Sequence, residues 1–185
     1  MVAMPAVEHP LTEDDVLQAF LELETPAGFK AELIEGEIVV TPPPDGDHED
    51  VIARFARAVA RHAAEELYVS GGKGLITPNG RFIPDATVAP VGHFRAQDSW
   101  SKPTDVRLVL EDTSTRPDND RGVKRLGYAA ADIPCYLLVD RTDGNVTLFA
   151  APEDGDYTAH VQVPFGKPLD LPAPFSFALD TAPLR

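Results

Sequence analysis

Two short apolar runs in the second half of the chain restrict its fold most strongly. They are residues 106–110, which only Arg107 interrupts, and residues 135–139. Each run ends directly before an acidic residue, Glu111 and Asp140 respectively. Continuous apolar runs of this length are typical of strands that are covered on both faces, near the middle of a sheet. We therefore predict a central β-sheet whose inner strands carry carboxylates at their ends.

A helix and a hairpin are predicted before these strands. Residues 12–23 begin with a capping threonine and three acids, and apolar residues then recur at helical spacing. Residues 29–34 and 37–40 are rich in strand-forming residues, and Glu35-Gly36 between them indicates a tight hairpin.

Two further helices are predicted later in the chain. Residues 48–67 carry an apolar stripe, with Asp47 as a candidate cap, and residues 120–131 form the second helix. The proline-rich residues 164–185 contain no clear long element. This order of helices and strands predicts an α+β (α/β) fold, a mixed β-sheet flanked by helices.

The charge of the chain is uneven. The net charge of −14 argues against a protein dedicated to coating DNA. Residues 51–141, however, hold thirteen basic and eleven acidic residues, so the middle of the chain can still face a phosphate backbone. The alternative is that the acidic ends only aid solubility.

Cysteine content and hydropathy indicate the cellular compartment in which the protein is expected. The single cysteine, Cys135, excludes an intrachain disulfide and fits a reducing compartment. Residues 1–10 do not resemble a signal peptide, and no run approaches the roughly 20 apolar residues that span a bilayer. We therefore expect a cytoplasmic protein with no membrane partner.

The strand ends hold candidate metal ligands. Asp85 opens a short apolar run and Glu111 follows another, so neighbouring strands would bring both carboxylates to one hard cation. Mg²⁺ or Mn²⁺ prefers oxygen ligands, and the backbone carbonyl of Asp112 is a candidate third ligand. The alternatives are a turn role for Asp85 and a solvated strand end for Glu111.

The predicted helix 120–131 offers a lysine for the same site. Asp120, Lys124 and Tyr128 lie four residues apart and share one helical face. Lys124 can orient water or neutralise charge on phosphorus, while Tyr128 can hold the lysine or a phosphate. The alternative is that Lys124 simply pairs with Asp120. Arg54 and Arg57 are candidate phosphate contacts, although a solvated helix face explains them more simply.

An ordered set of short motifs resembles the Uma-two family, a restriction-endonuclease-like family of the PD-(D/E)xK nuclease superfamily. The resemblance covers about residues 29–150 and depends on these motifs: Glu32-Leu-Ile-Glu35-Gly36-Glu37, His48 after a proline-rich segment, Pro84-Asp85, Leu-Val-Leu-Glu111-x-x-Ser114, Asp120-x-x-x-Lys124-x-x-x-Tyr128 and Ile133-Pro134-x-Tyr136-x-x-Val139-Asp140. It implies a single restriction-endonuclease-like domain over residues 1–185, with a core of about 29–150 and a C-terminal extension at 164–185.

The resemblance also implies roles for individual residues. Asp85 and Glu111 become the metal ligands, and Glu32 becomes an accessory acid at the rim. The usual lysine of the superfamily would fall at Thr113, and Lys124 on the following helix takes its place. His48 would lie at the mouth of the site, as a substrate contact or as a helix residue without a catalytic task.

Two departures from the family pattern affect the geometry of the site. Asp112 replaces the usual valine after the glutamate, and Ser114-Thr115 replaces the usual Ser-Pro. The side chain of Asp112 can add a metal ligand or point away from the ion.

The predicted function is that of a divalent-metal-dependent endonuclease, with DNA as the substrate by family analogy alone. A homodimer is expected if the substrate is a duplex with two strands to cut. One alternative is a catalytically silent nuclease fold that binds or regulates. Another is a metal hydrolase that acts on a small phosphate compound.

Overall fold

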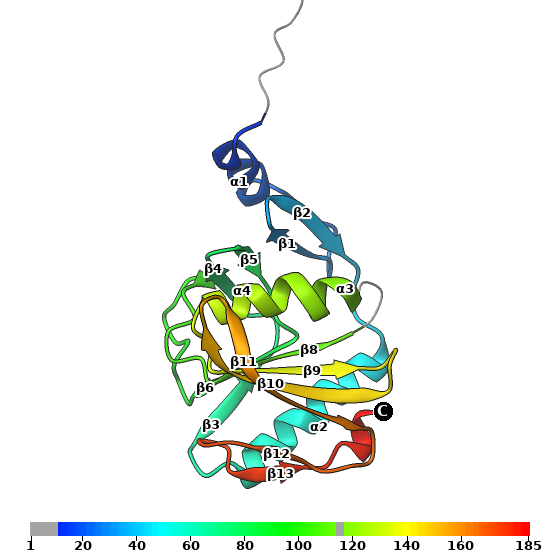
Figure 1. The fold of residues 1–185 in the computed structure, drawn as a ribbon. Helices are drawn as coiled ribbons and strands as arrows, with labels where there is room; N and C mark the ends of the chain where they lie inside the picture. Colours follow the sequence, from blue (N-terminus) through cyan, green and yellow to red (C-terminus); the bar gives the residue numbers. More distant parts are fainter. Residues whose placement is uncertain (1–10, 114–116) are drawn as a thin grey trace, which may run out of the picture.

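The computed structural model describes residues 11–113 and 117–185. Its central sheet contains the second apolar run and residues 108–110 of the first, whose strand begins at Leu108 and continues through Asp112 (Figure 1). Its strands are β3 (Leu67–Ser70), β6 (Ala86–Pro90), β8 (Leu108–Asp112), β9 (Cys135–Asp140), β10 (Asn145–Glu153) and β11 (Asp156–Pro164). Their order is β11-β10-β9-β8-β6-β3, with β8 and β9 parallel and the other pairs antiparallel. Every residue of β8 and β9 is buried, so the prediction of two inner strands is confirmed.

A second sheet lies beside the first. Its strands are β1 (Lys30–Ile34), β2 (Glu37–Thr41), β4 (Gly74–Thr77), β5 (Gly80–Phe82) and β7 (Trp100–Ser101), in the order β2-β1-β5-β4-β7. The β1–β2 hairpin is confirmed, because Glu35 and Gly36 both adopt the positive φ that a tight turn requires. At Gly80 an added Cβ would lie 1.9 Å from the carbonyl oxygen of Leu33, so only glycine lets β5 approach β1 this closely.

The helices that pack against the two sheets are α1 (Glu13–Leu21), α2 (Gly46–His62), α3 (Pro117–Asn119), the π-helical turn η1 (Asp120–Lys124) and α4 (Arg125–Ala130). The helix α2 covers one face of the central sheet and the segment α3–η1–α4 covers the other, whereas α1 packs against β1 and β2 of the second sheet. Phe55 of α2 packs with Leu108 and Leu110 of β8, whereas Tyr128 of α4 packs with Val109. Alternate residues of β8 therefore face different helices, as the pleat of a strand requires.

The structure corrects three details of the predicted helices. Asp45, not Asp47, caps α2, because its carboxylate accepts a hydrogen bond from the amide of His48. That helix ends at His62, since Leu67 begins β3. The helix predicted over residues 120–131 begins at Pro117 and contains the π-helical turn.

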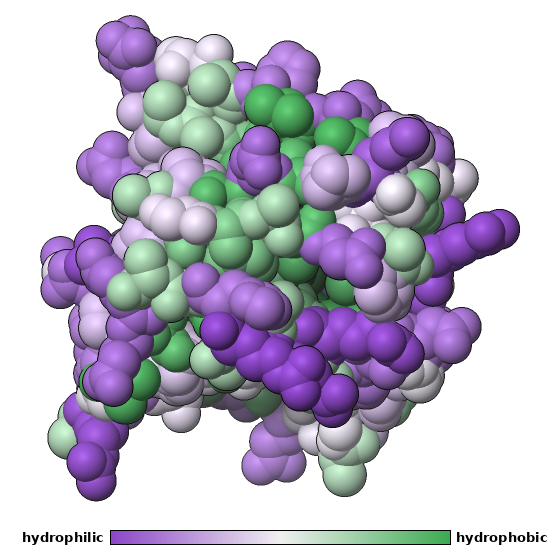
Figure 2. Space-filling view, turned by 90° about the horizontal axis from the view of Figure 1, so that it is seen from below, coloured by the Kyte–Doolittle hydropathy of each residue, from purple (hydrophilic) through white to green (hydrophobic). Residues whose placement is uncertain are grey.

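The C-terminal residues add short elements below the central sheet. They are β12 (Leu169–Leu171), β13 (Phe177–Leu179) and the 3₁₀ helix η2 (Ala182–Leu184). Leu169, Phe175 and Leu179 are buried in the same core as α2. Figure 2 shows this side of the molecule, where apolar surface is surrounded by polar residues. The predicted class, a mixed sheet flanked by helices, is confirmed.

Candidate active site

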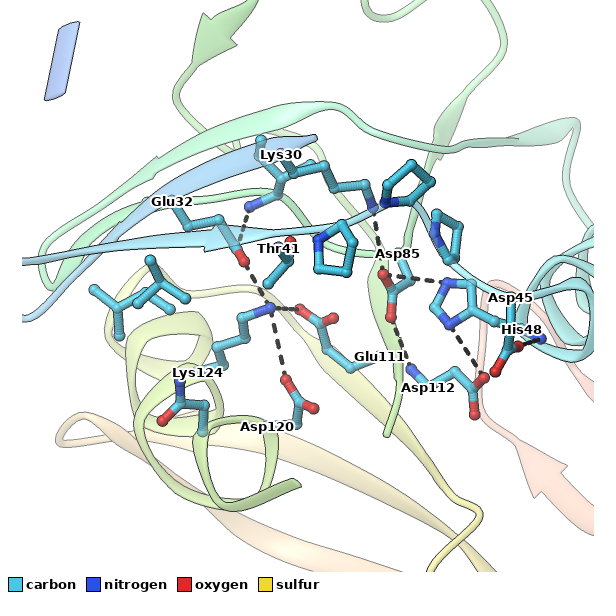
Figure 3. A pocket seen from close by; sticks show the side chains of 17 residues that line it. Lys30, Glu32, Thr41, Asp45, His48, Asp85, Glu111, Asp112, Asp120 and Lys124 are labelled. Atoms are coloured by element: carbon cyan, nitrogen blue, oxygen red, sulfur yellow. Dashed lines mark hydrogen bonds and ion pairs between the residues drawn. The ribbon is translucent and has the colours of Figure 1, made fainter. Parts of the chain in front are cut away.

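One pocket of about 260 Å³ lies between the β1–β2 hairpin and the ends of the central strands (Figure 3). Five segments supply its charged lining: β1, the start of α2, the residue before β6, the end of β8 and the π-helical turn. The charged residues are Lys30, Glu32, Asp45, His48, Asp85, Glu111, Asp112, Asp120 and Lys124. All of them except Asp45 belong to two clusters, which meet where Glu111 lies near Asp85.

The first cluster, here called the glutamate cluster, consists of Glu32, Glu111, Asp120 and Lys124. The ammonium Nζ of Lys124 lies 3.1 Å from Glu111 Oε1, 3.3 Å from Glu32 Oε1 and 3.6 Å from Asp120 Oδ1. Glu111 Oε1 also accepts a hydrogen bond from the hydroxyl of Tyr128. One ammonium therefore serves three carboxylates in an almost fully buried position.

The π-helical turn places Lys124 and Asp120 in this cluster. Arg121 in the turn donates two hydrogen bonds to Asp140 at the end of β9, at 2.7 and 3.0 Å. The hydroxyl of Tyr136 donates to the backbone carbonyl of Asp120 at 2.9 Å. Both contacts tie the turn to β9, which lies beside β8, the strand that carries Glu111. Such single π turns in helices are frequent at functional sites.

The second cluster, here called the histidine cluster, consists of the lining residues Lys30, His48, Asp85 and Asp112, together with Arg141, which pairs with Asp112 from outside the lining. Nε2 of His48 lies 3.3 Å from Asp85 Oδ1, and Nδ1 lies 3.2 Å from Asp112 Oδ2. Arg141 Nε lies 3.1 Å from Asp112 Oδ2, and Lys30 Nζ lies 3.5 Å from Asp85 Oδ1. Asp85 Oδ2 accepts a hydrogen bond from the backbone amide of Asp112.

The pKa shifts of the glutamate cluster share one cause. Burial raises the pKa of Glu111 well above its ordinary value; the ammonium of Lys124 opposes this shift, and the charges of Asp85, Asp120 and Glu32 add to it. Burial, again opposed by Lys124, raises the pKa of Asp120 to about 6. Burial would lower the pKa of Lys124, but the surrounding carboxylates raise it well above its ordinary value. This cluster therefore favours binding a further proton or cation.

The histidine cluster shows the opposite balance at Asp85. Burial would raise the pKa of Asp85, but the hydrogen bond from His48 and the charges of Lys124 and Lys30 hold it well below its usual range. Burial would lower the pKa of His48, but hydrogen bonds to Asp112 and Asp85 raise it to about 10. Burial raises the pKa of Asp112, because His48 and Arg141 offset it only in part.

The structure brings six of the predicted site residues into this one pocket: Glu32, His48, Asp85, Glu111, Asp112 and Lys124. The side chain of Asp112 turns toward His48 and Arg141. Tyr128 is fully buried, and its hydroxyl contacts Glu111 behind the lining.

Other residues named from the sequence lie outside the pocket lining. Arg54 and Arg57 lie on the exposed face of α2, where Arg54 pairs with Asp50. The hydroxyl of Thr113 donates a hydrogen bond to Asp140, so this side chain links the ends of β8 and β9. Residues 114 and 115 lie outside the described part of the chain.

The sequence analysis did not single out two cations of the site, Lys30 and Arg141. A signal for Lys30 was present, because it lies two residues before Glu32 on a predicted strand and therefore shares its face. Arg141 follows Asp140 at a strand end, and nothing local distinguishes it from an ordinary turn residue.

The donor set fits a hard cation that keeps part of its water shell. Within residues 11–113 and 117–185, no three histidine, cysteine or carboxylate side chains are placed to hold a metal by themselves. Mg²⁺ is commonly held by one or two carboxylates together with waters and substrate phosphate. Asp85 and Glu111 offer two such carboxylates, and Glu111 Oε2 makes no hydrogen bond to a described residue. The excess negative charge around Glu111 also favours a divalent cation.

Comparison with known proteins decides the family. A family model named Uma2, described as "Putative restriction endonuclease", matches residues 17–182. This chain belongs to the Uma2 family. The resemblance noted for the Uma-two motifs is thereby confirmed, and the family description supports a nuclease.

A solved structure shares the fold of this Uma2 protein. It is described as a "putative nuclease belonging to DUF820" from Anabaena variabilis, and it superposes with a TM-score of 0.70 at 15% identity. The match covers 95% of this chain and 97% of the other. At this identity the likeness establishes the restriction-endonuclease-like fold and no more. None of the curated proteins matches the chain.

In the described part of the chain, every helix is too short or too polar to cross a bilayer.

Proposed function

We propose that this Uma2 protein is a divalent-metal-dependent nuclease that hydrolyses phosphodiester bonds, with Mg²⁺ or Mn²⁺ as its cofactor and DNA as its substrate. One observation carries the proposal. The carboxylate of Glu111 lies between Lys124 and Asp85, so two acids and an ammonium converge on one pocket (Figure 3). The family description supports the same reaction class.

In this proposal, Asp85 and Glu111 hold the cation through their carboxylate oxygens. A bound Mg²⁺ or Mn²⁺ would polarise a phosphoryl oxygen and make hydroxide available near neutral pH. The three carboxylates around Lys124 raise its pKa, so in this proposal it acts as a charged group that orients water and not as a base. It keeps Glu111 in place and neutralises charge in the pocket, while Glu32 holds the lysine.

The test compares three site variants with a matched surface variant. Asp85→Ala, Glu111→Ala and Lys124→Ala should each lower Mg²⁺-dependent cleavage by about 100-fold or more, because each removes a ligand or the pocket ammonium. Asp118→Ala removes an exposed carboxylate next to the π-helical turn and should cleave like the wild type. Circular dichroism verifies folding, and equal activity in all five proteins would contradict the proposal. Plasmid, single-stranded DNA and nucleotides as substrates separate a nuclease from a hydrolase of small phosphate compounds.

A second candidate is a nuclease fold that binds without cutting, and the net charge of −14 favours it. Calorimetric titration with Mn²⁺ separates the two functions. Binding to the wild type that disappears in Asp85→Ala supports the enzyme, whereas no binding at millimolar Mn²⁺ supports the silent module. A homodimer and a cytoplasmic location remain part of the proposal, and sedimentation with and without a DNA duplex tests the dimer.

A further inference from the structure

The four cations of the two clusters are engaged to different degrees. Lys124 contacts three carboxylates, His48 faces a carboxylate with each ring nitrogen, and Arg141 contacts Asp112 and, at 3.4 Å, Asp45. Lys30 differs, because its described ion pair is a single 3.5 Å contact to Asp85. An ammonium has three protons to donate, so Lys30 can accept a further partner without losing Asp85.

The position of Lys30 gives it access to an incoming ligand. It begins β1 and faces the pocket together with Glu32 and Ile34, as alternate residues of a strand do. Its side chain is 29% exposed, whereas that of Lys124 is 8% exposed. In Figure 3 the amino group of Lys30 points toward Asp85, and Pro42, Pro43 and Pro44 line the same pocket.

A phosphodiester that enters this pocket needs such a group. Each phosphate carries a negative charge, and Glu32, Asp85, Glu111, Asp112 and Asp120 line the same space. Two of these acids would serve the cation, and a lysine at the mouth would supply a direct partner for the substrate. Lysine is well suited to phosphate as a compact charge with freely rotating donors.

We infer that Lys30 is a catalytic residue that donates a hydrogen bond to a non-bridging oxygen of the bound phosphodiester while it keeps its contact with Asp85. The inference rests on the proposed nuclease function, and it assigns different roles to the two lysines of the pocket. Lys124 holds the carboxylates inside the pocket, and Lys30 meets the substrate at its mouth.

The test uses Lys30→Met, with Lys167→Met as a control that removes the same charge from an exposed position outside the pocket. A fluorescent single-stranded oligonucleotide is titrated at several salt concentrations in Ca²⁺, a hard oxygen-liganded ion. Lys30→Met should bind about ten-fold more weakly, with a salt dependence reduced by about one phosphate contact. Lys30→Arg should recover most of the affinity, and Lys167→Met should match the wild type.

Mn²⁺ calorimetry without nucleic acid distinguishes this contact from a structural role. Lys30→Met should bind Mn²⁺ at least as tightly as the wild type, because a positive charge beside Asp85 is removed. Loss of Mn²⁺ binding in this variant would overturn the inference by showing that Lys30 shapes the pocket. If the wild type cleaves and Lys30→Met binds and cleaves like Lys167→Met, the inference fails and the proposed function survives. If the wild type neither binds Mn²⁺ nor cleaves, both fail.

Discussion

The glutamate cluster and the histidine cluster use similar side chains and carry opposite balances of charge. Three carboxylates surround one ammonium in the first, and the pKa values of Glu111 and Asp120 are raised. In the second, two carboxylates face a lysine, an arginine and a histidine, and the pKa of Asp85 is lowered.

The difference shows how one acidic chain can favour both a cation and an anion in a single pocket. In the proposed function, the excess negative charge around Glu111 would attract the metal ion. The positive charge around Asp85, which favours the ionised form of that carboxylate, would face the substrate. In both clusters burial opposes the charged state of the carboxylates, so the nearby charged partners decide how far each pKa moves. Three changes test this contrast.

The largest effect is expected from Lys124→Met. This variant leaves three carboxylates without their shared ammonium in a buried position. Removing one partner of a buried ion pair typically costs about 3–5 kcal/mol, and we expect a loss of that size in the free energy of unfolding. Urea denaturation in EDTA measures it. Adding Glu111→Gln to the same variant should recover part of the loss, and a loss below about 1 kcal/mol would mean that water already screens the cluster.

A smaller effect is expected from the pH dependence of His48. Its pKa is about 10 in the folded protein, against an ordinary value of 6.5. The folded state therefore holds the proton more tightly, and this stabilisation is complete below pH 6.5 and lost as the pH rises through 10. The wild type should lose about 2–3 kcal/mol over that range, the strength of a hydrogen bond to a charged group.

The matched protein for this measurement is His48→Gln, whose side chain does not titrate. Its urea stability in EDTA should change less between pH 6.5 and 10 than that of the wild type. If the stability of the two proteins changes equally between pH 6.5 and 10, His48 is neutral in the folded state over that range.

The smallest effect comes from neutralising one carboxylate in each cluster. Asp85→Asn should lower the metal-free stability by about 1–3 kcal/mol, because His48 and Lys30 lose a charged acceptor. Glu111→Gln should leave it within about 1 kcal/mol or raise it, since Lys124 keeps two other carboxylates. Urea unfolding measures the free energy of unfolding of both variants. Equal losses of stability would argue that the two clusters do not differ in their balance of charge.

Much of the fold follows from local sequence. The apolar runs predicted β8 and β9 because a strand buried on both faces needs no polar positions. Thr12 forms the expected helix cap, and Glu35-Gly36 forms the expected turn. The errors lie at helix boundaries and at the strand predicted over residues 106–110, which begins at Leu108 and continues through Asp112. The π-helical turn depends on Arg121 and Tyr136 contacts across β9, which no local pattern contains.

The candidate site was predictable in its central acids and in two of its four cations. Asp85 and Glu111 stood at strand ends, and the family motifs pointed to Glu32, His48 and Lys124. Their convergence in one pocket is observed, whereas their catalytic roles remain predictions. Lys30 and Arg141 were missed because their importance lies in partners far along the chain.

The sequence by itself determined which segments are strands and helices and which of them end in carboxylates, because periodicity and turn chemistry act between neighbouring residues. Only the tertiary structure decided how those carboxylates share their cations. Lys30 and Asp85 are 55 residues apart, and the sheet pairing brings them together. Burial and nearby charge, which set the pKa of each group, exist only after the distant segments have packed.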